Sequence, residues 1–222
     1  MSKHPSMQLI LGVLAVAALA SCATGPSAPP AASAAAVQVP AIPAPVPVSL
    51  DRKTTALLVL DISNAICPSR PACMASVPVI ESLLNRARAA NVPVIYSTTP
   101  SPKGPVPVLP SVTPRPGEPV VVTRANKFLD TNLEELLKQR NVRTAVIVGA
   151  AANGAVLYTS FHANAKGFTV VVAEDGISSG PDFDTFLTRY QLLNQPGFSN
   201  PGNKPLEAQR ATFSRSNLIT FR

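Results

Sequence analysis

The sequence has few of the residues that metal sites and nucleic-acid surfaces require. It contains only two histidines, His4 and His162, so no histidine-based metal cluster can be assembled and we expect no metal. Charged residues make up 14% of the 222 residues, and the formal net charge of +7 is spread thinly, without a block of like charges. This argues against a nucleic-acid partner and supports at most a mild attraction to anionic surfaces or small anionic ligands. We expect no cofactor either.

The N-terminal apolar run is too short to cross a membrane as a stable helix. It covers residues 9–20, follows a polar start at Lys3 and His4, and leads into Leu19-Ala20-Ser21-Cys22. Bacterial secretory signals are arranged in this way, so residues 1–21 are expected to be a signal peptide. Leu-Ala-Ser-Cys also resembles the lipobox of bacterial lipoproteins, in which Cys22 becomes the lipidated first residue. The alternative is an ordinary signal peptide with a chance cysteine.

A lipidated Cys22 would place the protein in the bacterial cell envelope. Two or three acyl chains anchor a protein stably, so the membrane is an expected partner through this lipid. Ala23 follows the cysteine, which by resemblance to Gram-negative lipoproteins is compatible with the periplasmic face of the outer membrane. Residues 22–50 are then the lipidated cysteine and a tether, because residues 23–49 are rich in Pro and Ala and carry no charge. Residues 51–222 are expected to form the folded domain.

Within residues 51–222, apolar runs of strand length alternate with segments of helical periodicity. This order is typical of an α/β fold, a three-layer αβα arrangement with a mostly parallel central sheet. One helix, 183–193, is expected to turn Phe186, Leu187, Tyr190 and Leu193 inward. The expected strands are 55–60, 92–96, 120–123, 144–148, 169–173 and 217–221, and the other expected helices are 76–90, 131–140 and 155–166.

Two features stand at the carboxyl ends of expected strands, where ligands bind in parallel sheets. Asp61 ends the first buried strand and is the first candidate for chemistry, with a helix-capping or loop acid as the alternative. The run from Ala150 to Ala155, which follows Gly149, is expected to form a tight turn before a helix and has almost no side chains. Backbone can come close to a ligand there, but nothing between Ala150 and Ala155 can act as a nucleophile, acid or base.

Two cysteines bracket the short segment CPSRPAC, at positions 67 and 73. In an exported protein with Cys22 lipidated, a local disulfide between Cys67 and Cys73 is the economical interpretation. The alternative is that Cys67 is a free nucleophile. It would need an activating base and a lowered pKa, and no such base is visible nearby in the sequence.

Three blocks of sequence resemble the isochorismatase-like (cysteine hydrolase) superfamily. They are Asp61 at its strand end, the element KFLDTNL at 127–133, and GAAANGAVLYT at 149–159 followed by Gly167-Phe168. The superfamily includes nicotinamidases, N-carbamoylsarcosine amidohydrolases and isochorismatases. The resemblance covers about residues 55–175 and implies a Rossmann-like αβα fold, and members commonly form homo-oligomers.

The family's amide hydrolases use an Asp, a Lys and a Cys, which the resemblance carries onto this chain residue by residue. Asp61 takes the place of the Asp. Lys127 matches the Lys in type, although its register is offset, and Arg124 is the alternative. Ala155 takes the place of the Cys, and its methyl group cannot attack a carbonyl, so the covalent route is closed. The family's oxyanion donors fall on the backbone N–H groups of Ala151 and Ala155, and the peptide before Ala151 is often cis.

Two functions remain open from the sequence. The missing cysteine favours a non-catalytic protein, a pseudoenzyme on the envelope that binds an unknown small molecule. The alternative is a non-covalent hydrolase of the isochorismatase type, which cleaves a vinyl ether with Asp61 as general acid. The resemblance also places a family acid at Asp175, where a structural role is as plausible as a catalytic one.

Overall fold

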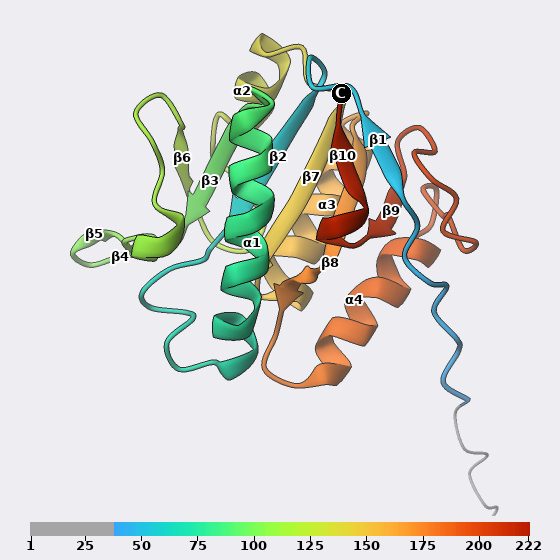
Figure 1. Cartoon of the computed structure of the whole chain (residues 1–222). Helices are drawn as coiled ribbons and strands as arrows, with labels where there is room; N and C mark the ends of the chain where they lie inside the picture. The colour runs from blue at the N-terminus through green and yellow to red at the C-terminus, as the bar shows by residue number, and fades with distance from the viewer. Residues whose placement is uncertain (1–37) are drawn as a thin grey trace, which may run out of the picture. The chain divides into compact units, whose positions relative to one another are not determined.

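The structure is a computed structural model, and it describes residues 38–222 (Figure 1). The predicted signal peptide and the predicted lipidation at Cys22 lie outside the described residues. Within residues 38–222, no helix combines the length and apolar character needed to cross a membrane. Residues 40–222 belong to one compact unit.

A six-stranded sheet forms the centre of this unit, and all of its neighbouring strands pair in parallel. The two central strands are buried nearly throughout, which is why their sequences are apolar without alternation. In spatial order the strands are β6 (Val120–Val122), β3 (Val94–Thr98), β2 (Thr55–Leu60), β7 (Thr144–Ala150), β8 (Thr169–Ser178) and β9 (Ala211–Ser214).

Helices cover both faces of the sheet, which confirms the predicted three-layer αβα fold. Helix α1 (Pro71–Ala89) crosses one face (Figure 1), where Leu83 packs in the same cluster as Leu57 and Val59 of β2. The opposite face of β2, with Leu58, packs in a cluster with residues of the other three helices. These are α2 (Leu133–Gln139), α3 (Leu157–Ala165) and α4 (Asp182–Asn194).

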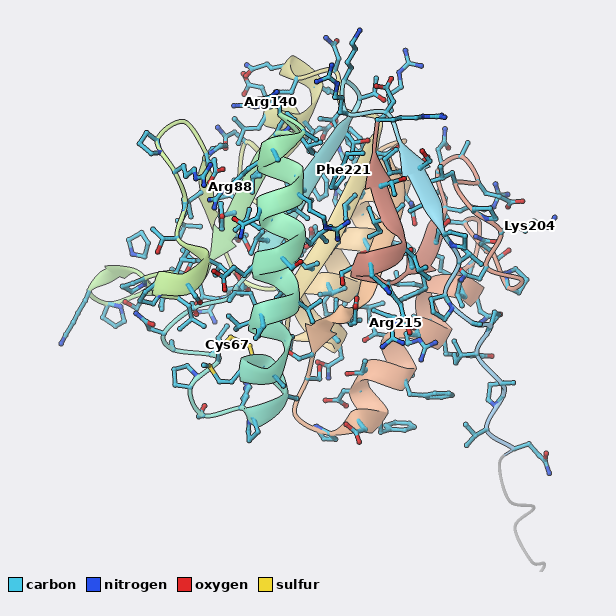
Figure 2. The ribbon with its side chains drawn as sticks, in the orientation of Figure 1. Cys67, Arg88, Arg140, Lys204, Arg215 and Phe221 are labelled. Carbon is cyan, nitrogen blue, oxygen red and sulfur yellow. A yellow bond between two sulfur atoms is a disulfide. The ribbon has the colours of Figure 1, made fainter. Side chains whose placement is uncertain are left out.

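The proline-rich segment after β3 is a long surface loop, and α1 holds part of it. The loop contains a small antiparallel pair, β4 (Pro100–Ser101) and β5 (Gly104–Pro105), and a short 3₁₀ turn. Arg88 of α1, labelled in Figure 2, donates two hydrogen bonds to Glu118, at 2.8 and 2.7 Å, and one to the hydroxyl of Tyr96 at 3.0 Å. A bidentate pair of this kind fixes the loop against the helix.

The folded domain begins earlier than predicted. Strand β1 (Val48–Leu50) pairs in parallel with β10 (Ile219–Phe221), and the backbone N–H of Val46 donates to the carbonyl of Phe213 at 3.0 Å. Composition suggested a tether as far as residue 50, but Val48 and Leu50 are buried in the core. Apolar side chains between the prolines therefore make this segment part of the domain.

Other boundaries also differ from the predictions. Helix α1 starts at Pro71, because proline is well suited to the first turn of a helix. Strand β9 was not predicted. In α4, Leu187 and Tyr190 are 39% and 36% exposed, so the prediction that they point inward is wrong. This helix instead packs through Thr188, Leu192 and Leu193.

Candidate functional site

Asp61 and the turn after β7 meet because of one glycine. Leu60 at the end of β2 is the register partner of Gly149 in β7. Gly149 has a φ of +139°, and a Cβ atom there would lie 2.1 Å from the carbonyl oxygen of Leu60. A side chain is therefore excluded sterically, and its absence lets the turn start beside the residue that follows Leu60. That residue is Asp61, which is 3% exposed and has a φ of +54°.

The carboxylate of Asp61 is paired with a buried lysine. Nζ of Lys127 lies 2.6 Å from Oδ2 of Asp61, and the hydroxyl of Ser97 donates to Oδ1 at 2.8 Å. The same Nζ donates to the backbone carbonyls of Thr123 and Arg124, at 3.2 and 2.6 Å. Three acceptors therefore surround an ammonium group whose residue is 0% exposed. Lys127, not Arg124, is thus the basic side chain that contacts Asp61.

Burial moves the proton affinities of the two paired groups toward each other. It raises the pKa of the Asp61 carboxyl, against the opposing effects of the Lys127 charge and of hydrogen bonds from Lys127 and Ser97. It lowers the pKa of the Lys127 ammonium, against the opposing effect of Asp61. Desolvation disfavours the charged form of each group, so the pair holds its charges mainly through mutual contact.

The turn after β7 presents backbone rather than functional side chains. The peptide bond between Ala150 and Ala151 is cis, as the resemblance implies. A π-helical turn at Ala152–Val156 follows and leads into α3, and such turns are frequent at functional sites. Ser179, just after β8, donates through its hydroxyl to Oδ1 of Asn153 at 3.1 Å, which ties the turn to the neighbouring strand. Ala155 is 3% exposed.

A cavity of about 300 Å³ lies where these elements meet. Its lining includes both Asp61 and the turn residues Ala151 and Ala155, so the structure brings the predicted positions together. Within residues 38–222, the guanidinium groups of Arg70 and Arg124 form no ion pair with a carboxylate. The full lining is Asp61, Ile66, Arg70, Thr99, Pro100, Arg124, Ala125, Ala151 and Ala155.

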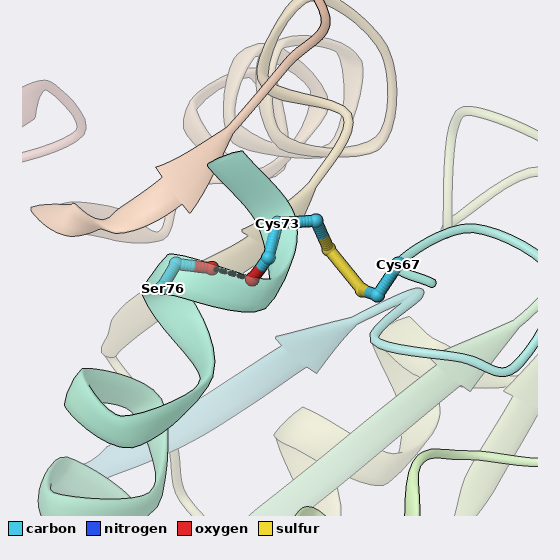
Figure 3. Close-up of a disulfide and its surroundings, with 3 residues drawn as sticks. All are labelled: Cys67, Cys73 and Ser76. Carbon is cyan, nitrogen blue, oxygen red and sulfur yellow. Dashed lines mark hydrogen bonds between the residues drawn. A yellow bond between two sulfur atoms is a disulfide. The ribbon is translucent and has the colours of Figure 1, made fainter. Parts of the chain in front are cut away.

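The predicted disulfide between Cys67 and Cys73 is confirmed (Figure 3). It joins the loop after Asp61 to the first turn of α1, and both cysteines are buried. The hydroxyl of Ser76 donates to the carbonyl of Cys73 at 2.8 Å, one turn further along the helix. The alternative prediction of Cys67 as a free nucleophile is therefore wrong. Both cysteines of the described part of the chain are bonded to each other, so the cavity contains no thiol from residues 38–222.

Arg70 was not singled out in the sequence, although it lies between the two bracketing cysteines. Its position at the cavity follows from the path of the loop, which spacing alone does not reveal. The signal that was available is its place in a short disulfide-closed segment only a few residues after Asp61.

Two other polar residues considered from the sequence have structural contacts. The ring of His162 stacks on Phe128 with centroids 5.1 Å apart, and its Nδ1 lies 3.0 Å from Nδ2 of Asn126. No group of three or more potential metal-binding His, Cys, Asp or Glu side chains occurs in residues 38–222. Asp175 accepts hydrogen bonds from the backbone N–H and the hydroxyl of Ser216, both at 2.8 Å, so its contacts support a structural role.

Solved structures with the same fold include several hydrolases. A cysteine hydrolase from Pseudomonas syringae pv. phaseolicola superposes with a TM-score of 0.64 at 18% identity, covering 82% of this chain and 95% of that one. An N-carbamoylsarcosine amidase from Thermoplasma acidophilum gives 0.59 at 22% identity, covering 74% and 97%. A putative isochorismatase-family hydrolase from Chromobacterium violaceum gives 0.64 at 23% identity, covering 79% and 96%. At these identities the similarity establishes the fold.

The sequence itself matches a family and a curated relative. The secreted isochorismatase effector Isc1 of Verticillium dahliae is 34% identical over 113 residues, which is 46% of this chain and 60% of the effector. The chain therefore spans less than two thirds of that relative. The model of the isochorismatase domain matches residues 55–189, which is more than half of the chain and includes both Asp61 and Ala155. The chain belongs to the isochorismatase domain family.

Proposed function

We propose that this domain hydrolyses a small anionic molecule without a covalent enzyme intermediate, and that Asp61 is the general acid. The observation that carries this proposal is the buried Asp61–Lys127 pair, whose Asp61 lines the same cavity as Ala151 and Ala155. A buried ion pair generally costs desolvation energy and is weak evidence for a role in stability. In this family, such a pair at the edge of a cavity is better explained by a catalytic role.

The reaction that suits these residues is cleavage of a vinyl ether. A protonated Asp61 transfers its proton to the terminal carbon of the double bond, which leaves an oxocarbenium ion. Water adds to that ion, and the resulting hemiketal breaks into an alcohol and a carbonyl compound. The proton released from the water returns to Asp61. Burial raises the pKa of Asp61, which favours the protonated form that the first step requires.

Lys127 and Ser97 have a defined part in this route. Proton transfer turns the Asp61 carboxyl into a carboxylate, and the ammonium of Lys127 and the hydroxyl of Ser97 already lie 2.6 and 2.8 Å from its oxygens. They therefore stabilise the conjugate base as it forms, without rearrangement. The backbone N–H groups of Ala151 and Ala155 are the proposed donors to a substrate oxygen, since donors of this kind need no side chain.

The cavity favours an anionic substrate. When Asp61 is ionised, its charge is compensated by Lys127, and when it is protonated, Lys127 adds a positive charge. The remaining charged side chains of the lining are Arg70 and Arg124. Guanidinium groups bind carboxylates with two parallel hydrogen bonds, which gives both affinity and orientation. We further propose that Ala155 replaces the family's nucleophilic cysteine. Amides that require an acyl-enzyme intermediate are then not substrates.

A second candidate is binding without turnover. It is favoured by the short distance between Lys127 and Asp61, because an ammonium at 2.6 Å stabilises the ionised carboxylate and opposes its protonation.

Turnover assays separate the two candidates. Purified domain is incubated with isochorismate and with simple amides such as nicotinamide, and carbonyl product and ammonia are measured. We expect turnover of the vinyl ether alone, and its loss in Asp61→Asn, with Asp51→Asn as a control because Asp51 is exposed in a turn before β2. Absence of turnover, together with saturable binding of the vinyl ether, would establish the binding role instead. Release of ammonia would refute the non-covalent route.

We also propose that the domain is an envelope lipoprotein. The proposal rests on the sequence: a signal peptide at residues 1–21, a lipobox cysteine at position 22, and an uncharged Pro/Ala-rich tether that leads to the domain. The periplasmic face of the outer membrane is the proposed location. Mass spectrometry of the membrane fraction should find acyl chains on Cys22. Cys22→Ser should be released from the membrane, and an unmodified Cys22 in the native protein would refute the anchor.

A further inference from the structure

Arg70 reaches the cavity from a loop that is closed by the disulfide. The loop leaves the site at Asp61 and returns to the core at α1, and both Ile66 and Arg70 line the cavity. Arg70 is the residue that precedes the first turn of α1. Its backbone N–H donates to the carbonyl of Cys67 at 2.9 Å, and its own carbonyl accepts from the N–H of Cys73 at 2.9 Å. The two bonded cysteines thus hold the backbone of Arg70 from both sides.

Hydrogen bonds to the proline-rich loop hold the start of this loop, where the N–H of Asn64 donates to the carbonyl of Pro107 at 3.0 Å. Before the disulfide, the N–H groups of Ile66 and Cys67 both donate to the carbonyl of Ser63, at 3.1 Å. Pro68 and Ser69, which lie between Cys67 and Arg70, are exposed. The covalent link between Cys67 and Cys73 is therefore a direct constraint on where this segment places Arg70.

The two arginines of the cavity differ in how they are held. Arg124 is exposed, and its carbonyl oxygen accepts a hydrogen bond from Lys127 at 2.6 Å, so its backbone is fixed by the ion pair of the site. Arg70 is partly buried, and its position depends on the loop and the disulfide. A change at Arg70 or at the disulfide can therefore alter recognition while leaving the Asp61–Lys127 pair in place.

We propose that Arg70 selects ligands that carry a carboxylate, and that the Cys67–Cys73 disulfide is the element that positions it. This deepens the proposed function by naming the residue that recognises the substrate's charge, and it rests on that function for the identity of the site. It does not require turnover. The disulfide thereby links ligand recognition to an oxidising compartment, because reduction removes the covalent constraint on the segment that carries Arg70.

Binding of two matched probes tests this proposal. Succinate and succinamide have nearly the same size, but only succinate carries carboxylates. Their dissociation constants are measured by calorimetry on the oxidised domain, and we expect succinate to bind about tenfold more tightly, as for a charge-assisted hydrogen bond. Arg70→Gln should lose most of this preference, and Arg70→Lys should keep part of it. Arg52→Gln is the matched control, since Arg52 is an exposed arginine in the turn before β2.

The disulfide is tested with the same probes. Cys67→Ser/Cys73→Ser, and native protein treated with a reductant, should lose the preference for succinate to a similar extent as Arg70→Gln. Far-UV circular dichroism and a thermal melt show whether each protein is still folded at the temperature of the measurement. Equal binding of the two probes to the native domain overturns the proposal, as does an unchanged preference in Arg70→Gln. An unchanged preference in the folded disulfide-free protein overturns the positioning role.

The outcome is independent of the proposed reaction. A preference that depends on Arg70 in a domain that turns over no vinyl ether would retain this inference and refute the hydrolase. Turnover of the vinyl ether by a domain that does not prefer succinate would support the hydrolase and refute the role of Arg70.

Discussion

Replacing Lys127 with methionine should destabilise the domain strongly. The side chain is fully buried, and its Nζ donates to the carboxylate of Asp61 at 2.6 Å and to two backbone carbonyls. Methionine has a similar shape but no charge, so Asp61 would stay buried without its partner. Removing one member of a buried ion pair typically costs about 3–5 kcal/mol in the free energy of unfolding. We expect a loss in this range at pH 7.

The size of this loss should depend on pH. Without Lys127, burial raises the pKa of Asp61 further above its usual value of 3.8, because the main opposing effect is gone. Between 3.8 and the raised pKa, the folded state binds a proton that the unfolded state does not. The free energy of unfolding of the variant therefore falls as the pH rises through this window. The loss relative to the native protein should be smaller near pH 4 than at pH 7.

Urea unfolding followed by far-UV circular dichroism measures this loss, because the chain has no tryptophan to serve as a fluorescent probe. Lys138→Met is the control. Lys138 pairs with Glu134 one turn earlier on α2, but its side chain is 64% exposed, so its loss should stay below about 0.5 kcal/mol. Asp61→Asn/Lys127→Met removes both charges and should recover much of the stability. A loss below about 1 kcal/mol for Lys127→Met, or a loss that is the same at both pH values, would refute this account of the pair.

Three further outcomes are expected. Gly149→Ala should cost about 3 kcal/mol or more in the free energy of unfolding, because the new Cβ meets the carbonyl oxygen at the end of β2. Gly180→Ala is the control, since a Cβ atom there has open space and should cost much less. Similar urea midpoints for the two variants would contradict this. If Asp61 is the general acid, kcat/KM for the vinyl ether should fall as the pH rises through the pKa of Asp61, which burial raises above 3.8. A value of kcat/KM that instead increases with pH would argue against an acid role. Cys67→Ala/Cys73→Ala should cost about 2 kcal/mol, as expected from the short loop that the disulfide closes, and urea curves of oxidised and reduced protein provide the check.

The parts of the fold that could be predicted are the buried strands, because burial on both faces requires a continuous run of apolar residues. Strands β2 and β7 are covered on both faces, so their apolar runs were recognisable, and with them the strand end that carries Asp61. Strand β9 was missed because two of its four residues, Thr212 and Ser214, are polar. Both are nevertheless buried, and Thr212 accepts a hydrogen bond from the N–H of Leu206 at 3.1 Å.

The candidate site was predictable as a location but not as a set of contacts. The register of Lys127 stayed open because it depends on a turn in which Nζ folds back onto carbonyls three and four residues earlier. The predicted tether, residues 22–50, extends too far because proline and the lack of charge indicate an extended linker, although Val48 and Leu50 bury their side chains. Arg70 reaches the cavity through the three-dimensional course of its loop, which local patterns do not encode.

The pairing of β1 with β10 has a practical consequence for work on this domain. A recombinant fragment that starts at Asp51 would lack β1 and leave β10 without the strand that pairs with it. Deleting residues 219–222 would remove β10 and leave β1 without its pairing partner. Fragments for crystallisation or assay should therefore start at or before Pro40 and extend at least to Arg222, with affinity tags placed beyond these limits.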